Sequence, residues 1–138
     1  MRICAEASES ELNAALGACG GVPEAEDLRA PEIGLVMLRG RIGGDGARFN
    51  IGEATVTRAV VRLGDGTVGH SYLLGRSARR ARLAAIVEAL GQNPAHRAAL
   101  ESALIIPVRA RRDAELKAQR EQSAATRVNF FTLVRGED

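Results

Sequence analysis

Two apolar, β-rich runs joined by a glycine–aspartate–glycine turn constrain the fold of this chain more than any other feature. The runs occupy residues 53–63 (EATVTRAVVRL) and 67–74 (TVGHSYLL). Between them, Asp65-Gly66 is the strongest short-range hairpin signal a sequence can carry. The pattern predicts an antiparallel hairpin, around which the rest of a sheet can be built.

The same dipeptide predicts the register of the hairpin. A two-residue turn at Asp65-Gly66 places Val61 opposite His70. That face is mostly apolar, so we expect it on the core, with His70 as a hydrogen-bonded core histidine rather than a metal ligand. The opposite face carries Arg58 and Arg62 and should meet solvent or a partner.

Two further segments have strand character. Residues 34–42 (GLVMLRGRI) are rich in apolar residues, and their alternation places Arg39 and Arg41 on one face. Residues 127–134 (RVNFFTLV) are apolar on both faces of a strand. Such a strand must be covered on both sides, as happens at a subunit interface. We therefore expect about four strands.

The acidic residues 1–33 precede the strand region. Ser8 or Ser10 can cap a short helix there, and glycines after it end the helix. Pro23 and Pro31 then indicate a linker rather than a regular element.

Residues 77–125 are predicted to be helical. Ser77 begins one helix and Gly91 ends it, and a longer helix starts with Pro94 in its favoured first position. Pro107 should break or kink that longer helix, because proline lacks the N–H that the helix needs.

Length and composition fit a single domain spanning residues 1–138. The chain is 46% hydrophobic and 26% charged, so it should fold rather than stay disordered. Strands from 34–74 and 127–134 would form an antiparallel sheet of about four strands. With the helices packed largely on one face of that sheet, the expected fold class is α+β.

Charge is unevenly distributed along the chain, although the net charge is only +2. Residues 1–33 carry two arginines against seven acidic residues. Residues 76–127 carry ten arginines and one lysine against five acidic residues. This polarity suits head-to-tail contact with partners, or an anion held by the second half.

Arg79 and Arg80 stand in the first turns of the predicted helix at 77–91, where the helix dipole disfavours cations. A bound anion or an acidic partner surface would reverse that cost, which makes both residues candidate anion contacts. The alternative, which we favour, is that these long side chains extend into water over apolar neighbours.

Composition argues against several classes of function. Aromatic residues make up 3% of the chain, too few for the stacking platforms of a nucleic-acid-binding protein. No run approaches the roughly 18 apolar residues of a membrane span, and the first residues lack a secretory pattern. Cys4 and Cys19 have neither the number nor the spacing of a zinc site. We expect free thiols, no metal and a cytoplasmic protein.

The glycine-rich stretch RGRIGGDGARFNIGEATVTR (39–58) has some features of a phosphate-binding loop. It lacks the Gly-Lys-Ser/Thr of a Walker loop, and Phe49 stands where the dinucleotide fingerprint needs its third glycine. The local sequence favours a mobile connection between two strands. Glu53 has no neighbouring base or nucleophile, and no catalytic set is recognisable, so we expect no catalytic residue on this chain.

At the level of family, residues 29–76 (RAPEIGLVMLRGRIGGDGARFNIGEATVTRAVVRLGDGTVGHSYLLGR) resemble the G subunit of the bacterial carbon–phosphorus lyase system. The closing residues 124–138 (AATRVNFFTLVRGED) resemble the C-terminus of that subunit. The resemblance covers nearly the whole chain and is weakest in the first twenty residues.

The resemblance implies an accessory, non-catalytic subunit of a multi-subunit transferase, ribose 1-methylphosphonate 5-triphosphate synthase, in organic phosphonate catabolism. ATP and an alkylphosphonate are the substrates of the assembled complex, adenine is released, and this chain carries no cofactor. The implied partners are the I, H, J and L subunits. For the isolated chain we expect a homodimer.

The arginines then have two candidate uses. They contact acidic residues of partner subunits, which we favour, or they hold triphosphate and phosphonate through bidentate contacts. The candidate residues are Arg39, Arg41, Arg58 and Arg62, with Glu53 and Thr57 as second choices. The rival hypothesis is a stand-alone anion- or nucleotide-binding or regulatory module, which would bind nucleotide without help.

Overall fold

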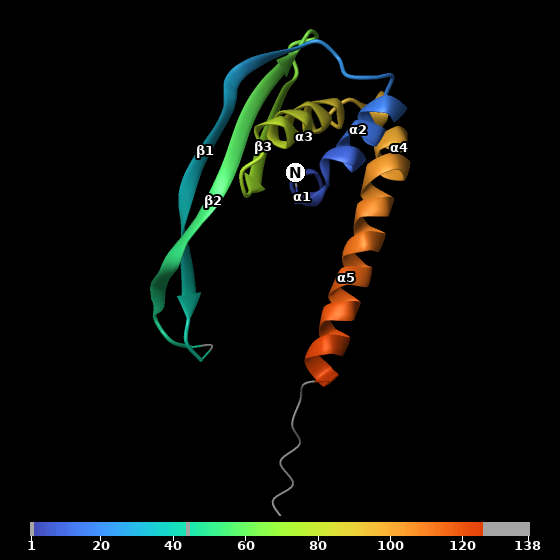
Figure 1. The fold of residues 1–138 in the computed structure, drawn as a ribbon. Coiled ribbons are helices and arrows are strands. Elements are labelled where there is room, and N and C mark those ends of the chain that lie inside the picture. Colours follow the sequence, from blue (N-terminus) through green and yellow to red (C-terminus); the bar gives the residue numbers. More distant parts are fainter. Residues whose placement is uncertain (1, 44, 126–138) are drawn as a thin grey trace, which may run out of the picture.

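The computed structural model describes residues 2–43 and 45–125. Within them, three antiparallel strands form one sheet in the order β1-β2-β3 (Figure 1). The strands are β1 (Ala25–Arg41), β2 (Arg48–Leu63) and β3 (Val68–Leu74). The α+β class is confirmed, although the described residues hold three strands rather than about four. The strand predicted at 127–134 lies outside the described residues.

The helices pack against one face of the sheet, as the sequence predicted. The central helix, α3, lies across β2 and β3 and contacts the short N-terminal helices, against which the helices after α3 pack in turn (Figure 1). Val61, Leu73 and Ile86 are among the fully buried side chains that join the sheet to α3. The helices are α1 (Arg2–Glu6), α2 (Glu9–Ala18), α3 (Ala78–Leu90), α4 (Pro94–Leu100) and α5 (Ile106–Ala125).

The predicted register of the hairpin is wrong by one residue. The Leu63 N–H donates to the Thr67 carbonyl (2.9 Å), which makes Gly64–Gly66 a three-residue turn with Gly66 at φ +87°. Val61 therefore pairs with Gly69 rather than with His70. Because a one-residue slip moves every side chain to the other face, His70 is exposed and is not a core histidine.

The acidic linker expected up to residue 33 is also wrong in its second half. β1 begins at Ala25 and pairs with the far end of β2, at Leu63. The pairing is interrupted between Asp27 and Glu32, next to Pro31, which has no N–H for a regular ladder. Residues of low strand propensity are held here by the long partner strand rather than by their own preference.

The helix ends follow the sequence signals. Ser8 caps α2 in a capping box, in which the Glu11 N–H donates to Ser8 Oγ and the Ser8 N–H donates to Glu11 Oε2 (2.7 Å). Ser77 caps α3, and Gly91 ends it. These contacts span three or four residues, which is why local sequence is enough to predict them.

Pro107 neither breaks nor ends the long helical stretch. A π-helical turn, η1 (Glu101–Ile105), follows α4 and leads directly into α5, whose second residue is Pro107. The wider turn is a way to pass a residue that lacks an N–H and whose ring would clash with the carbonyl four residues back. The predicted break is therefore a change of helix type.

The acidic first part of the chain and the basic later part neutralise one another within the molecule. Arg79 pairs with Glu9 (3.0 Å), and Arg82 pairs with Asp27 (2.7 Å). Arg111 on α5 pairs with Glu11 (2.9 Å). The polarity that suggested head-to-tail partners is thus used, in large part, to hold the N-terminal segments against α3 and α5.

Candidate functional site

A two-stranded ribbon projects from the body of the protein and is the most distinctive surface of the fold. The last pair between β2 and β3 is Val56 with Leu74, and beyond it β1 and β2 continue alone (Figure 1). We call this ribbon the arm: residues 33–43 and 45–56. The pairing of Arg41 with Arg48 closes its outer end.

The arm exposes large apolar side chains outside the buried core. Ile33, Leu35 and Met37 alternate along β1, and each is more than half exposed (55%, 62% and 53%). Ile51 on β2 is 63% exposed and Ile42 in the turn 75%. Contiguous apolar surface of this kind marks interaction sites in soluble proteins.

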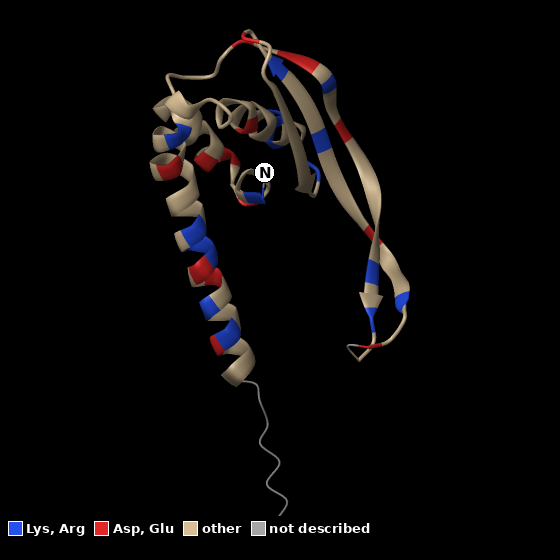
Figure 2. Cartoon of the chain, turned by 180° about the vertical axis from the view of Figure 1, so that it is seen from behind, with Lys and Arg blue, Asp and Glu red and all other residues tan. Residues whose placement is uncertain are grey.

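Three arginines stand on one face at the tip of the arm. Arg39 and Arg41 alternate on β1, and the cross-strand pair Arg41–Arg48 brings the third onto the same face. None of the three side chains has a hydrogen bond or ion pair with another described residue. Figure 2 shows the basic segments near the end of the arm. Like charges directly opposite each other destabilise a ribbon, so this tip favours an external negative charge.

Arg58 and Arg62 form a separate set. They lie on the outer face of the sheet, as the sequence predicted, and each pairs across the strands with an acidic residue of β1. Arg58 pairs with Glu32, and Arg62 Nη2 lies 2.7 Å from Glu26. The structure therefore does not bring the four candidate arginines together, and two of them already have partners.

The second-choice residues differ in kind. Thr57 is fully buried: its hydroxyl donates to the Gly75 carbonyl (2.7 Å) and accepts from the Ser77 N–H (3.1 Å). It ties β2 to the start of α3. Glu53 lies on the arm opposite Met37 and is exposed.

Arg79 and Arg80, the candidate anion contacts, are engaged within the molecule. Arg79 pairs with Glu9, and Arg80 Nη2 donates to the Leu74 carbonyl (3.0 Å). Both interactions place a negative charge or a carbonyl dipole beside the cations that the helix N-terminus disfavours.

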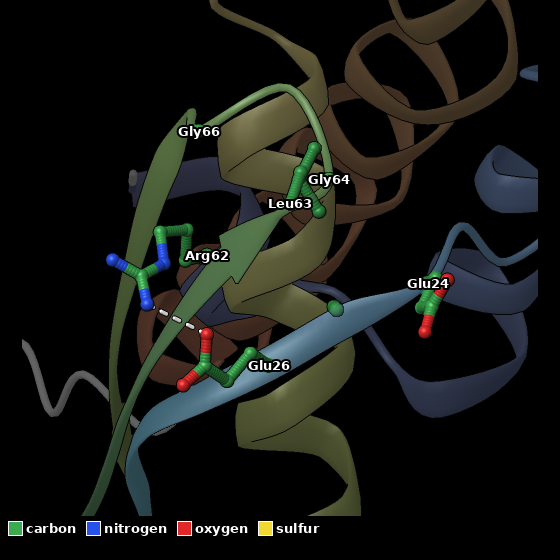
Figure 3. Close-up of a pocket in the computed structure, with 7 residues that line it drawn as sticks. Glu24, Glu26, Arg62, Leu63, Gly64 and Gly66 are labelled. Carbon is green, nitrogen blue, oxygen red and sulfur yellow. Dashed lines mark hydrogen bonds and ion pairs between the residues drawn. The ribbon is translucent and has the colours of Figure 1, made fainter.

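A hollow of about 460 Å³ opens at the opposite end of the sheet from the arm tip. Glu24, Glu26 and Arg62 line it together with the turn after Leu63 (Figure 3). Figure 3 shows Arg62 directed toward Glu26, so its charge is used within the rim. Two carboxylates beside one paired arginine make this hollow unsuitable for an anion.

The remaining chemistry of the described residues is limited. Cys4 and Cys19 are free thiols, and burial raises the pKa of each. No three His, Cys, Asp or Glu side chains among the described residues are grouped to hold a metal ion. Among the described helices, none is long and apolar enough to cross a membrane.

The sequence analysis missed Arg48. It lies inside the glycine-rich stretch, and only the register of β1 with β2 shows that it faces Arg41. The sequence does contain one usable signal. Six residues separate Arg41 from Arg48, so a six-residue connection between two strands would place these arginines opposite each other.

Comparison with known proteins places the chain in a family. The profile of the family described as "Phosphonate metabolism protein PhnG" matches residues 1–136. The chain is also 57% identical, over all of its 138 residues and 88% of the relative, to a protein of Rhizobium meliloti (strain 1021). That protein is named alpha-D-ribose 1-methylphosphonate 5-triphosphate synthase subunit PhnG. The chain belongs to the PhnG family of phosphonate metabolism proteins.

Proposed function

We propose that this chain is an accessory subunit of a ribose 1-methylphosphonate 5-triphosphate synthase, in which ATP and an alkylphosphonate react with release of adenine. The support is the 57% identity, over the whole chain, to a protein named as a subunit of that synthase. A protein named as a subunit works in an assembly, so the chain needs surfaces for partners.

The structural observation that carries this role is the arm. It combines exposed apolar side chains with unpaired arginines, and this is the composition of protein interfaces, where apolar residues form the centre and arginine is enriched. We propose that the arm contacts other subunits of the synthase, with I, H, J and L subunits as the candidates. Cytoplasmic assembly and a homodimer of the isolated chain belong to the same proposal.

The test is calorimetry with purified components. ATP is titrated into this chain alone, into its I-subunit partner alone and into the mixture of the two. Tight association of the two chains, with no heat from ATP and this chain alone, supports an accessory subunit. Failure of the chain to associate with any candidate subunit would refute the proposal.

A second candidate function rests on one observation: Arg41 and Arg48 face each other across the strands at the arm tip, and neither side chain has an ion-pair partner among the described residues. Guanidinium groups in such a pair suit the bidentate binding of a triphosphate or phosphonate. This function predicts micromolar ATP binding by the isolated chain that is lost in Arg41→Gln. Arg97→Gln, which removes an exposed arginine from α4, is the matched control.

A further inference from the structure

The two edge strands of the sheet differ in whether other parts of the molecule bond to their outward-facing backbone groups. Side chains of α3 and of Gln92, just after it, bond to the free edge of β3: the His70 N–H donates to Glu88 Oε2 (3.0 Å), Gln92 Nε2 donates to the Val68 carbonyl (2.8 Å), and Arg80 Nη2 donates to the Leu74 carbonyl (3.0 Å). These side chains take three of the backbone groups that another strand would need. The β3 edge is therefore already partly used within the molecule.

The free edge of β1 along the arm is open. Leu63 and Thr55 of β2 direct their backbone groups toward the β3 side, so the even-numbered residues of β2 face β1. Their partners on β1 are the even-numbered residues from Gly34 to Leu38. The N–H and C=O of Ile33, Leu35 and Met37 are left at the free edge, and no side chain among the described residues bonds to them.

The same three residues also carry the exposed apolar side chains of the arm. Directly beyond them, on the same face, stand Arg39 and Arg41. Unpaired backbone groups, exposed apolar side chains and two arginines thus lie along the same stretch of about nine residues of β1. Together they match the requirements of β-strand addition, in which main-chain bonds give affinity and alternate side chains give specificity.

We propose that the free edge of β1, from Ile33 to Arg41, receives an extended segment of a partner subunit. This inference rests on the proposed function and deepens it. The added strand presents apolar side chains beside Leu35 and Met37 and carries acidic residues where it passes Arg39 and Arg41.

A second copy of this chain does not fit the edge as well as a different polypeptide. Antiparallel pairing of two β1 edges centred on Leu35 places Arg39 opposite Pro31. Moving the axis to Val36 places Arg39 opposite Ile33 and Arg41 opposite Pro31, and in both arrangements the arginines meet no acidic residue. Moving it to Gly34 places Arg41 opposite Asp27, which is already paired with Arg82. Pro31 lies within the paired segment in every case and has no N–H to donate.

The experiment measures amide hydrogen exchange of the full-length chain, resolved by residue, when it is free and when it is in the assembled synthase complex. On assembly, the amides of Ile33, Leu35 and Met37 should slow by about tenfold or more, while Gly34 and Val36, already bonded to β2, change little. This alternation with period two is a signature that burial of one face without strand pairing would not give.

A pair of variants at Leu35 adds an independent readout. Leu35→Pro removes an edge N–H that β2 does not use, so the fold should survive while affinity for the partner falls by about tenfold or more. Leu35→Ala keeps the N–H, so the alternating protection should persist despite the smaller side chain. Circular dichroism of each free variant checks that it has folded.

The outcomes separate this inference from the proposed function. A complex that assembles with unprotected edge amides overturns the inference and leaves the accessory role intact. Protection that rises with concentration in the free chain would assign the edge to a second copy instead. Protection in the free chain that disappears when residues 126–138 are deleted would assign it to the chain's own C-terminal segment. Absence of any complex overturns both proposals.

Discussion

Arg111 of α5 joins that helix to the N-terminal helices through two acceptors and has a third on α5 itself. Its guanidinium donates to Glu11 (2.9 Å), to the Glu6 carbonyl (2.9 Å) and to Glu115 (2.8 Å). The hydrogen bond from Arg111 holds the pKa of Glu11 below its ordinary value of 4.5, and the Ser8 N–H and hydroxyl lower it further. Because the folded pKa is depressed, the stabilisation is present above about pH 4.5 and is lost as the pH falls below it.

Glu11→Gln should therefore lower the free energy of unfolding by about 1 kcal/mol at pH 7, and by less at pH 3, which lies below the ordinary pKa of the carboxyl, where the stabilisation from ionised Glu11 is being lost. Glutamine can keep the capping box through its Oε1, but its NH2 then faces the Arg111 Nε–H, so the change removes the charge together with one hydrogen bond. Urea unfolding at the two pH values measures the difference. Glu9→Gln, which removes an exposed ion pair with Arg79, is the control and should have little effect. An equal loss at both pH values would contradict the linkage.

Gly69 allows α3 to approach the sheet. A Cβ at this position would overlap the Ala85 carbonyl oxygen and lie 2.8 Å from Ala89 Cβ. Gly69→Ala should destabilise the protein by about 2 kcal/mol or more, because α3 cannot move without opening the core. Gly34→Ala, on the arm, has nothing within 4 Å of the new Cβ and should leave the thermal midpoint nearly unchanged. Thermal unfolding of both variants compares the two sites.

At the scale of elements, the sequence predicts what short-range contacts decide and fails where distant residues decide. The caps of α2 and α3 depend on neighbours three residues away, so Ser8 and Ser77 identify them. The register of β3 depends on which residue fits under α3, and only Gly69 does. No local pattern contains that contact, so the two-residue turn was the natural prediction at Asp65-Gly66.

The start of β1 illustrates the same limit. Ala25 to Glu32 form a strand because they pair with β2 as far as Leu63, where Arg62 and Arg58 also neutralise Glu26 and Glu32. A region read from its prolines and acidic residues as a linker is thus a strand whose partners lie about thirty residues away. The same pairing, which no local sequence pattern reveals, gives Arg58 and Arg62 acidic partners within the molecule.

The charges that face each other at the arm tip lead to a prediction about the stability of the arm. Arg41 faces Arg48, and Arg39 faces Asn50. Arg41→Glu should convert a repulsive cross-strand pair into an attractive one and stabilise the arm by about 0.2–1 kcal/mol. Slower amide exchange at Phe49 and Gly40 would report the gain. Arg39→Glu makes the same charge change opposite a neutral residue and should give a smaller effect; equal effects would show that cross-strand pairing is not the cause.

At the scale of the whole molecule, the body and the arm are stabilised differently. The buried core is built from the helices and from the part of the sheet beyond residue 58, and among the described residues of the arm only Val56, at its base, is buried. A two-stranded ribbon without a packed face is marginally stable in water. The arm therefore relies on its ladder and on whatever covers it, which is what the proposed contact with another subunit would supply.

The same division explains how much of the candidate site could be predicted. Alternation alone places Arg39 and Arg41 on one face, and the pairing of β1 with β2 agrees. What the sequence does not contain is which arginines are neutralised within the fold, since that depends on acidic residues brought together by tertiary structure. Arg39, Arg41 and Arg48 differ from Arg58 and Arg62 in this respect, not in composition or in spacing.

If the tip binds an acidic partner segment, its three charges should act on assembly and not on folding. The variant with Arg39, Arg41 and Arg48 all replaced by glutamine should associate with the partner subunits more slowly, with a weaker dependence on salt. Its thermal midpoint should not fall, because these side chains have no partners among the described residues. Stopped-flow association at several ionic strengths measures the effect.

A control must remove the same net charge elsewhere, since any loss of positive charge slows association with an acidic partner. Arg76, Arg97 and Arg120 are exposed and also lack partners among the described residues, and all three lie off the arm. Replacing them together by glutamine matches the change in net charge. If the two triple variants lose association rate equally, the long-range field of the whole molecule steers assembly; a loss confined to the arm variant means that the tip makes the contact.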